Sequence, residues 1–298
     1  MKRITIIILF FAATGKLSAQ QLQTSAFYEL QGVIHNPSLA GVGEHDFIGA
    51  NYRTQWSSLD DAPKTVTVFG SFNLPKHKMG ISGNVFNDKT GPTSRTGISL
   101  SVAKHILFKD NSTLSLGIEN RFQQFSINTA KLAETLGNDP AIGNKNNSFK
   151  YDAGFGISYT NDRLQLGASV AQLLQTKQNN YTGSLVRNQE ARLYRHYYMH
   201  GSYKMNLDET STVTPSFLII YLPNATTEYN FAAKYRLENV FSASVGISAT
   251  GNANVGAGLN LTKNIVMDYA FNIYNNPSDI SNSYTNAHEF MLRYFFRN

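Results

Sequence analysis

Long stretches of this chain alternate between apolar and polar or small side chains. Between Tyr229 and Glu238 the odd-numbered residues are apolar, and most of the residues between them are polar. The same period of two continues through residues 241–250, 254–262 and 265–273, and it is present earlier at 98–102 and 114–118. A period of two places the apolar side chains on one face of a β-strand. The pattern therefore predicts a fold built from strands with one apolar face.

The length and number of these segments favour a membrane barrel over a soluble sandwich. Each lasts about ten residues, which is the span that a tilted strand needs to cross a bilayer. Residues 46–296 hold about fourteen such segments, and bacterial barrels have an even number of strands. A soluble sandwich would have shorter strands and more surface charge. We predict an all-β fold, a transmembrane antiparallel β-barrel of the bacterial outer membrane with about 14 strands.

The connections between the segments alternate in length. Short ones include 161–162, 238–239 and 263–264, whereas residues 126–149, 176–191 and 276–287 form longer ones. Short periplasmic turns and long external loops are typical of an outer-membrane barrel.

Two segments fit this pattern less well. Lys104 has the same parity as Leu100 and Val102, so it must lie at the interface, extend its ammonium group to water, or follow a bulge. Residues 211–222 contain Pro215 and are apolar at both parities in their second half, so their register is the least certain.

The N-terminus has the pattern of a secretory signal. Lys2 and Arg3 precede an apolar run at 4–13, and Leu17-Ser18-Ala19 then offers a cleavage site before Gln20. We expect residues 1–19 to be a signal peptide and 45–298 to form the barrel. Residues 20–44 would be a lead that lies in the periplasm or in the lumen, because Asn36-Pro37 is an extended or turn dipeptide.

Composition and charge narrow the function. Only 15% of the 298 residues are charged, against about 25% in an average soluble domain. Removing Lys2, Arg3 and Lys16 with the signal lowers the net charge from +6 to +3, and basic residues never run longer than two. This distribution argues against a nucleic-acid partner. The absence of cysteine excludes thiol catalysis and thiolate metal sites.

Candidate chemistry is sparse. His196 and His200 lie about 13 Å apart on a strand, too far to share one metal ion. His288-Glu289 opens the last strand, where hydrogen bonding at the rim explains it. We expect no catalytic, cofactor or metal residues. Charges at lumen parity could line a pore or neutralise one another; they are Glu119, Arg121, Asp152, Lys234, Arg236, Asp268 and Arg293.

Four short motifs are more individual than the barrel pattern. They are His35-Asn36-Pro37-Ser38-Leu39-Ala40-Gly41, Arg53-Thr54-Gln55-Trp56 followed by Ala62-Pro63, Asp88-x-x-Gly91-Pro92, and the closing His288-Glu289. In this order and spacing the chain resembles the PorP/SprF family of type IX secretion outer-membrane proteins over nearly its whole mature length. The resemblance makes these residues candidates for partner binding or for a lumenal plug: Asn36, Pro37, Gly41, Arg53, Gln55, Trp56, Pro63, Asp88, Gly91, His288 and Glu289.

The resemblance implies a non-enzymatic barrel in the outer membrane of Bacteroidota that works with type IX export and gliding motility. Such proteins either join the core machine and link to its periplasmic components, or bind and anchor a secreted surface adhesin that bears a type IX C-terminal domain. An outer-membrane pore or hydrophobic-substrate channel is the alternative, and a hydrolase lacks a credible triad.

Three of the motif residues have physical interpretations of their own. Trp56 falls where the first strand meets the outer interface, so it is either an aromatic-belt anchor or a partner contact. Arg53 and Gln55 have the opposite parity and could pair with lumenal carboxylates.

Overall fold

The computed structural model describes residues 25–43, 45–57, 61–131, 147–178, 191–192, 194–223, 225–238, 240–274 and 286–296. The expected signal peptide lies outside these residues, as does much of the three long connections. Among the described residues, no helix is long and apolar enough to cross a membrane.

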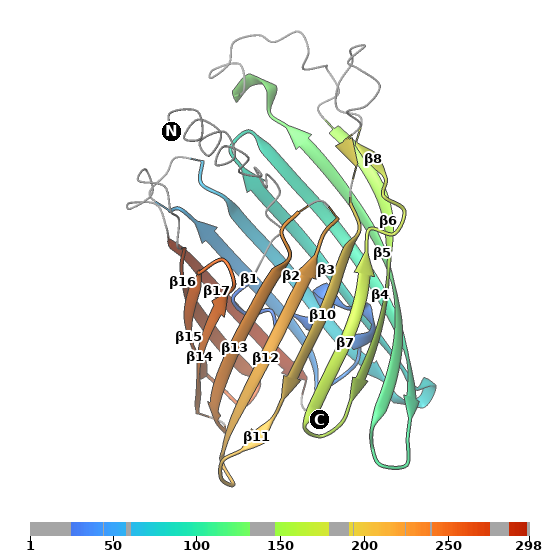
Figure 1. Ribbon diagram of the computed structural model, residues 1–298, viewed down its shortest axis with the longest axis vertical. Helices are drawn as coiled ribbons and strands as arrows, with labels where there is room; N and C mark the ends of the chain where they lie inside the picture. The colour runs from blue at the N-terminus through green and yellow to red at the C-terminus, as the bar shows by residue number, and fades with distance from the viewer. Residues whose placement is uncertain are drawn as a thin grey trace, which may run out of the picture.

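The described chain forms one closed antiparallel barrel, drawn in Figure 1. β1 pairs with β17 and β10 pairs with β12, so the sheet has no free edge. A short segment, β11 (Met205–Asn206), continues β10 along the same partner, which leaves fourteen barrel strands in the described part of the chain. The prediction of an antiparallel outer-membrane barrel with about fourteen strands is thus confirmed.

The barrel strands are β1 (Asp46–Gln55), β2 (Lys64–Leu74), β3 (Met79–Thr90), β4 (Thr93–Leu107), β5 (Thr113–Ile127), β6 (Asn147–Thr160), β7 (Leu164–Ala171), β10 (His196–Tyr203), β12 (Ser211–Tyr221), β13 (Glu228–Leu237), β14 (Phe241–Ser248), β15 (Ala253–Asn260), β16 (Ile265–Ile273) and β17 (Asn286–Phe296). Outside the barrel wall, β8 (Lys177–Gln178) pairs with β9 (Ala191–Arg192).

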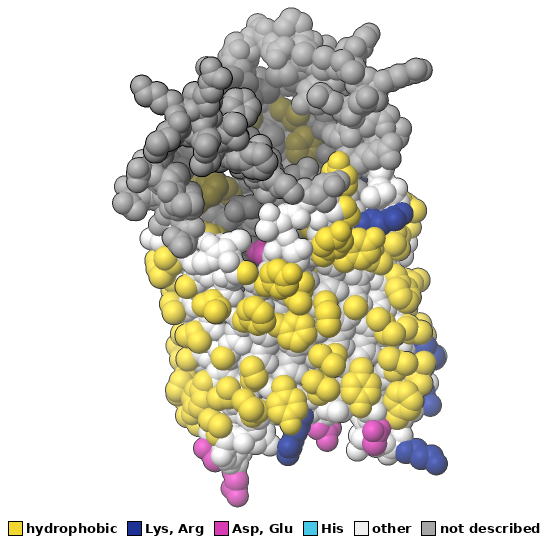
Figure 2. Space-filling view, viewed as in Figure 1, with side chains coloured by type: hydrophobic (Ala, Val, Ile, Leu, Met, Phe, Trp, Pro, Cys, Tyr) yellow, Lys and Arg dark blue, Asp and Glu magenta, His cyan; other side chains and the backbone are white. Residues whose placement is uncertain are grey.

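The apolar and polar side chains that alternate in the sequence lie on opposite faces of the barrel wall. On β4, Ser99 and Ser101 face the lumen and are buried, whereas Leu100 between them is 58% exposed on the outside. Apolar side chains cover much of the outer surface between the two ends (Figure 2). In a bilayer this belt contacts the hydrocarbon, which explains why so many large apolar side chains are exposed to the outside.

The two ends of the barrel differ. Six connections are short and lie at the end where β17 finishes; the first of them contains a 3₁₀ turn, η2 (Pro75–His77). The strand ends that the three long connections join lie at the opposite end (Figure 1). We call these the short-turn end and the long-loop end; in outer-membrane barrels the short turns face the periplasm.

Lys104 stays in register on the outer face, opposite Met79 and Leu116. Its ammonium group donates a 2.7 Å hydrogen bond to the carbonyl oxygen of His77 in the short turn after β2. Of the three alternatives, the structure therefore shows a side chain that extends to the membrane edge, without a bulge.

The register of β12 follows from its inner face. Leu218 and Ile220 face the lumen and are each 2% exposed, while Phe217 and Ile219 point outward. Pro215 has no N–H to donate, and the pairing of β12 with β10 stops at Ser216. Pairing resumes at Val213 with β11, so the proline explains why one strand is split into β10 and β11.

Residues 25–43 lie inside the barrel, and we call them the lumenal segment. They include a single helical turn, α2 (Gly32–His35), and a 3₁₀ turn, η1 (Pro37–Leu39). The two turns contact β2–β6 from within the lumen (Figure 1).

Candidate functional site

The lumenal segment descends through the barrel. At its start, Ser25 bonds to Glu289, three residues from the long-loop end of β17. Further along, the amide of Asn36 donates to the carbonyl oxygen of Ile157, near the short-turn end of β6. The segment leaves the lumen at Gly41, and β1 then begins at the short-turn end. The lumen is therefore crossed by a polypeptide over most of its height.

Asn36 organises the lower half of the segment. Its backbone is extended, as expected before a proline, and Pro37 opens the 3₁₀ turn. Its Oδ1 accepts hydrogen bonds from the N–H and hydroxyl of Ser38, at 2.9 and 2.7 Å. Its Nδ2 lies 3.0 Å from Nε2 of His200, and the residue is fully buried. One side chain thus caps the turn and bonds it to the wall.

Glycines in the wall make room for this turn. A Cβ on Gly117 would lie 2.3 Å from the backbone of Pro37, and one on Gly80 would lie 1.9 Å from the carbonyl oxygen of Ala40. Real Cβ atoms do not approach other atoms so closely, so the turn packs directly against the backbone of the sheet. Gly156 and Gly167 leave the same kind of space beside Asn36.

Gly41 ends the turn. Its φ of +68° lies in the left-handed region that favours glycine, and its N–H donates a 2.8 Å hydrogen bond to the hydroxyl of Ser71. A side chain here would also meet the backbone of Gly80 at 2.6 Å. The Asn-Pro-x-x-Ala-Gly motif is thus a turn shaped to fit the wall.

Glu289 holds the upper end of the segment. Its carboxylate is fully buried and accepts from the hydroxyl of Ser25 at 2.5 Å and from the N–H of Ala26 at 2.9 Å. From the wall, Asn51 donates to it at 2.7 Å and Arg53 at 3.3 Å. Two motifs that are more than 230 residues apart in the sequence thus meet on neighbouring strands.

A second charged cluster lies deeper in the lumen. Arg293 bonds to Asp268 at 2.8 Å, and Lys234 lies 4.0 Å from Asp268 and 3.7 Å from Glu29 of the lumenal segment. Burial raises the pKa of Glu29 above its usual range, and the nearby Lys234 ammonium opposes that rise. Elsewhere in the lumen Arg121 pairs with Glu119 at 2.9 Å. These side chains neutralise one another, which is one of the two alternatives given above for the lumenal charges. Arg236 is exposed.

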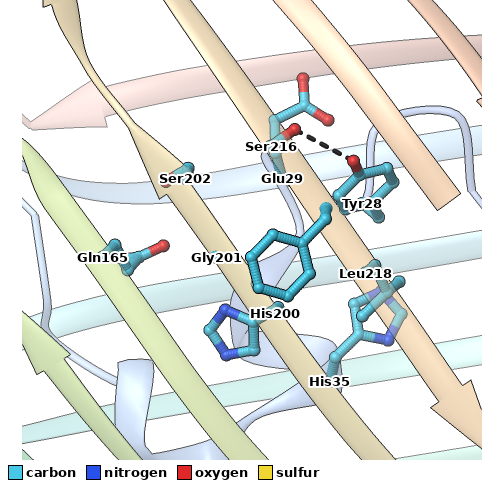
Figure 3. Close-up of a pocket in the computed structure, with 11 residues that line it drawn as sticks. Tyr28, Glu29, His35, Gln165, His200, Gly201, Ser202, Ser216 and Leu218 are labelled. Atoms are coloured by element: carbon cyan, nitrogen blue, oxygen red, sulfur yellow. Dashed lines mark hydrogen bonds between the residues drawn. The ribbon is translucent and has the colours of Figure 1, made fainter. Parts of the chain in front are cut away.

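Apolar contacts complete the attachment. Tyr28 packs with Leu218, Ile220 and Leu222, and its hydroxyl lies 3.0 Å from that of Ser216, as Figure 3 shows. On the opposite side Phe27 packs among inward-facing side chains that include Phe69. A small cavity remains between Tyr28, His35 and β10 (Figure 3).

The remaining candidates lie at the rim or outside. Gln55 donates to the hydroxyl of Tyr274 at 2.9 Å, as part of a group that also includes Arg53. Trp56 follows β1 and is half-buried, and its backbone N–H donates a hydrogen bond to the carbonyl oxygen of Asn286. The carbonyl oxygen of Pro63 accepts from the N–H of Gln55 at 3.0 Å.

Asp88 lies near the end of β3, and Gly91 lies in the connection from β3 to β4, at the long-loop end. Asp88 accepts from Thr65 at 2.9 Å and lies 3.8 Å from Arg95, and Gly91 has a φ of +56°. His288 points outward, where its ring lies 2.8 Å from the hydroxyl of Tyr269. The structure places Asn36, Pro37 and Gly41 at one site and Arg53 and Glu289 at another, with Gln55 joined to Arg53 through Tyr274. Trp56, Pro63, Asp88, Gly91 and His288 lie apart from both sites.

The histidines of β10 are engaged with protein groups. His196 lies 2.7 Å from the carbonyl oxygen of Tyr194, and His200 bonds to Asn36. Across the described ranges, no group of three His, Cys, Asp or Glu side chains could hold a metal ion.

Sequence reasoning missed the partners of the lumenal segment on the wall. Tyr28, Glu29 and the glycine positions carried no motif signal. The one available sign was the apolar inner parity of residues 217–221, which a water-filled lumen does not explain.

The fold and the lumenal segment define an outer-membrane β-barrel with an N-terminal plug. The family model for "Type IX secretion system membrane protein PorP/SprF" matches residues 16–294. The chain belongs to this family, and its place is the outer membrane. No curated protein matches the chain.

Solved structures share the fold. A structure titled "CymD monoaromatic hydrocarbon channel" is 10% identical with a TM-score of 0.50, covering 90% of this chain and 93% of that one. A "TodX deltaS2S3 mutant monoaromatic hydrocarbon channel" is 10% identical with a TM-score of 0.51, covering 88% and 92%. The outer membrane protein Omp33 of Acinetobacter baumannii is 8% identical with a TM-score of 0.49, covering 86% and 100%. At this identity the similarity concerns the fold alone.

Proposed function

We propose that this type IX secretion barrel is not an enzyme, and that it binds a secreted surface protein, such as an adhesin, and anchors it at the cell surface. The observation that carries the proposal is the lumenal segment, which is bonded to the wall at both ends and packed between them. The alternative within the same family role is a link to periplasmic components of the machine, for which the short-turn end is the available surface.

The lumenal segment favours binding over transport. A passive pore or a channel for hydrophobic substrates needs a continuous path from one end to the other. Here Asn36, Ser38 and Ala40 are fully buried between the glycines of the wall, and Glu289 and its donors close the other side. Such a barrel has its exposed surfaces at the two ends, and the long-loop end faces the cell exterior.

Affinity purification tests the proposal. We would tag the short-turn end, extract the protein from its native outer membrane in mild detergent, and identify what remains bound by mass spectrometry. We expect a large secreted protein or components of the secretion machine, and the identity of the partner decides between anchoring and linking. A barrel that is recovered alone at low salt, and that conducts reproducibly in planar bilayers, would refute the proposal in favour of a channel.

A further inference from the structure

A second cavity, which we call the vestibule, lies above the lumenal segment at its long-loop end. It opens to solvent, and its empty space counted together with that opening is about 410 Å³. Ser25 and Ala26 form its floor, and its wall comes from β13–β16, the loops next to them, and Arg53 of β1. The side chains of the wall are mostly primary amides and hydroxyls, including Asn230, Ser248, Asn254 and Asn272.

Two of these amides, those of Asn230 and Asn272, have an Nδ2 donor without an acceptor among the described residues. Asn272 is 7% exposed, and its Nδ2 has no hydrogen-bond partner among the described residues. Buried amide donors are nearly always paired in native proteins. Asn254 lies directly across the ladder from Asn272, and Gly246 on its other side has no side chain, which leaves space for the Asn254 amide along the wall. The wall thus presents amide groups to the cavity.

The charge of the vestibule indicates what it would bind. Arg53 lines it, but its guanidinium already pairs with Glu289 at 3.3 Å. The other charged side chain is the acid Glu228. This arrangement does not favour a phosphate or another anion. Primary amides carry both donors and an acceptor, and these groups complement the alternating N–H and C=O groups of an extended polypeptide.

Polar side chains of the lumenal wall already bind a polypeptide backbone through hydrogen bonds. Side chains of the wall hold the backbone of the lumenal segment at three levels: Glu289 accepts from the N–H of Ala26, Ser169 donates to the carbonyl oxygen of His35, and Ser71 accepts from the N–H of Gly41. The vestibule continues the same wall beyond Ser25.

We propose that the vestibule receives an extended segment of the secreted partner, held through hydrogen bonds between its backbone and the amides of Asn254 and Asn272. This inference rests on the proposed function and assigns it a site. The competing occupants are residues 20–24 of the same chain, which precede Ser25, and a surface glycan.

Crosslinking in the native outer membrane tests the site. The chain has no cysteine, so Asn254→Cys carries the only thiol and can be labelled with a maleimide–benzophenone reagent. The control is Val255→Cys, whose side chain is 51% exposed on the lipid face of the same strand. After illumination we expect a peptide of a secreted protein joined to residue 254 and absent at residue 255. Crosslinks only to residues 20–24, only to glycan, or equal at both positions would overturn the inference.

A substitution provides the second measurement. Asn272→Leu removes the unpaired donor at nearly constant size, and we expect the retained partner to fall about threefold to tenfold, the effect of one neutral hydrogen bond. The control is Ile273→Leu on the lipid face, and the heat-dependent mobility shift on gels verifies that both variants fold. Unchanged retention in Asn272→Leu would overturn the site. If the partner still co-purifies without crosslinking at residue 254, the proposed function stands and only the vestibule is wrong.

Discussion

Replacing Glu289 with alanine should release the upper end of the lumenal segment and destabilise the barrel. The carboxylate accepts four hydrogen bonds, and the side chain of its ion-pair partner Arg53 is 5% exposed. Removing one partner of a buried ion pair costs about 3–5 kcal/mol, because the other charge stays buried. Ser25 and Ala26 at the start of the segment can turn towards water, so we expect the loss of Arg53 pairing to dominate.

Urea unfolding in detergent, followed by the gel mobility shift, measures the loss. Glu289→Gln is the comparison variant: it leaves the charge of Arg53 unpaired but keeps the shape and one acceptor oxygen, so it should lose less than Glu289→Ala. In the double variant Arg53→Met/Glu289→Ala the buried charge is gone, so its loss should be smaller than the sum of the two single losses by about 0.5–3 kcal/mol. A loss below about 1 kcal/mol for Glu289→Ala, or strict additivity in the double variant, would refute the assignment.

Three further predictions concern the lower half of the segment. Gly117→Ala should displace the turn at a cost of about 1–3 kcal/mol and raise hydrogen exchange in residues 25–43, while Gly83→Ala, where the nearest atoms lie 3.2 Å away, should not. Asn36→Ala should lower stability to urea by about 2–3 kcal/mol, and Asn36→Asp, which keeps the acceptor for Ser38 but buries a carboxylate against the carbonyl oxygen of Ile157, should lose at least as much. Burial lowers the pKa of His35 from about 6.5 in the unfolded chain to about 3 in the folded one. The contribution of the neutral imidazole to the free energy of unfolding is therefore complete above pH 6.5 and declines as the pH falls towards 3. The urea midpoint should therefore drop between pH 7.5 and pH 5 more in the wild type than in His35→Gln, and equal drops would contradict this.

The barrel could be predicted from the sequence because each strand carries its own evidence. Leu100 and Val102 alternate with serines, and that local period is enough to assign a face. Lys104 illustrates the limit: parity placed it outward, but only the position of the turn at His77 shows where its ammonium group bonds.

The attachment of the lumenal segment could not be predicted, because its contacts are long-range. Asn36 bonds to residues 121 and 164 positions away, and no local pattern encodes such pairs. A wall glycine such as Gly156 has the same appearance in the sequence whether it faces water or a polypeptide. Leu218 and Ile220 were the exception, since apolar side chains on the inner parity need something apolar to cover them.

The lumenal segment also braces, from within, the part of the wall where a strand is split. The ladder between β10 and β12 has six residue pairs and is interrupted at Pro215. His200 on one side of this seam bonds to Asn36, and Leu218 on the other side packs on Tyr28. The lumenal segment therefore contacts both strands that meet at this seam, β10 and β12, and holds them together. A partner that displaced the lumenal segment would remove these contacts and weaken the barrel along the β10–β12 seam. A mechanical load on an anchored protein would then act on this seam first.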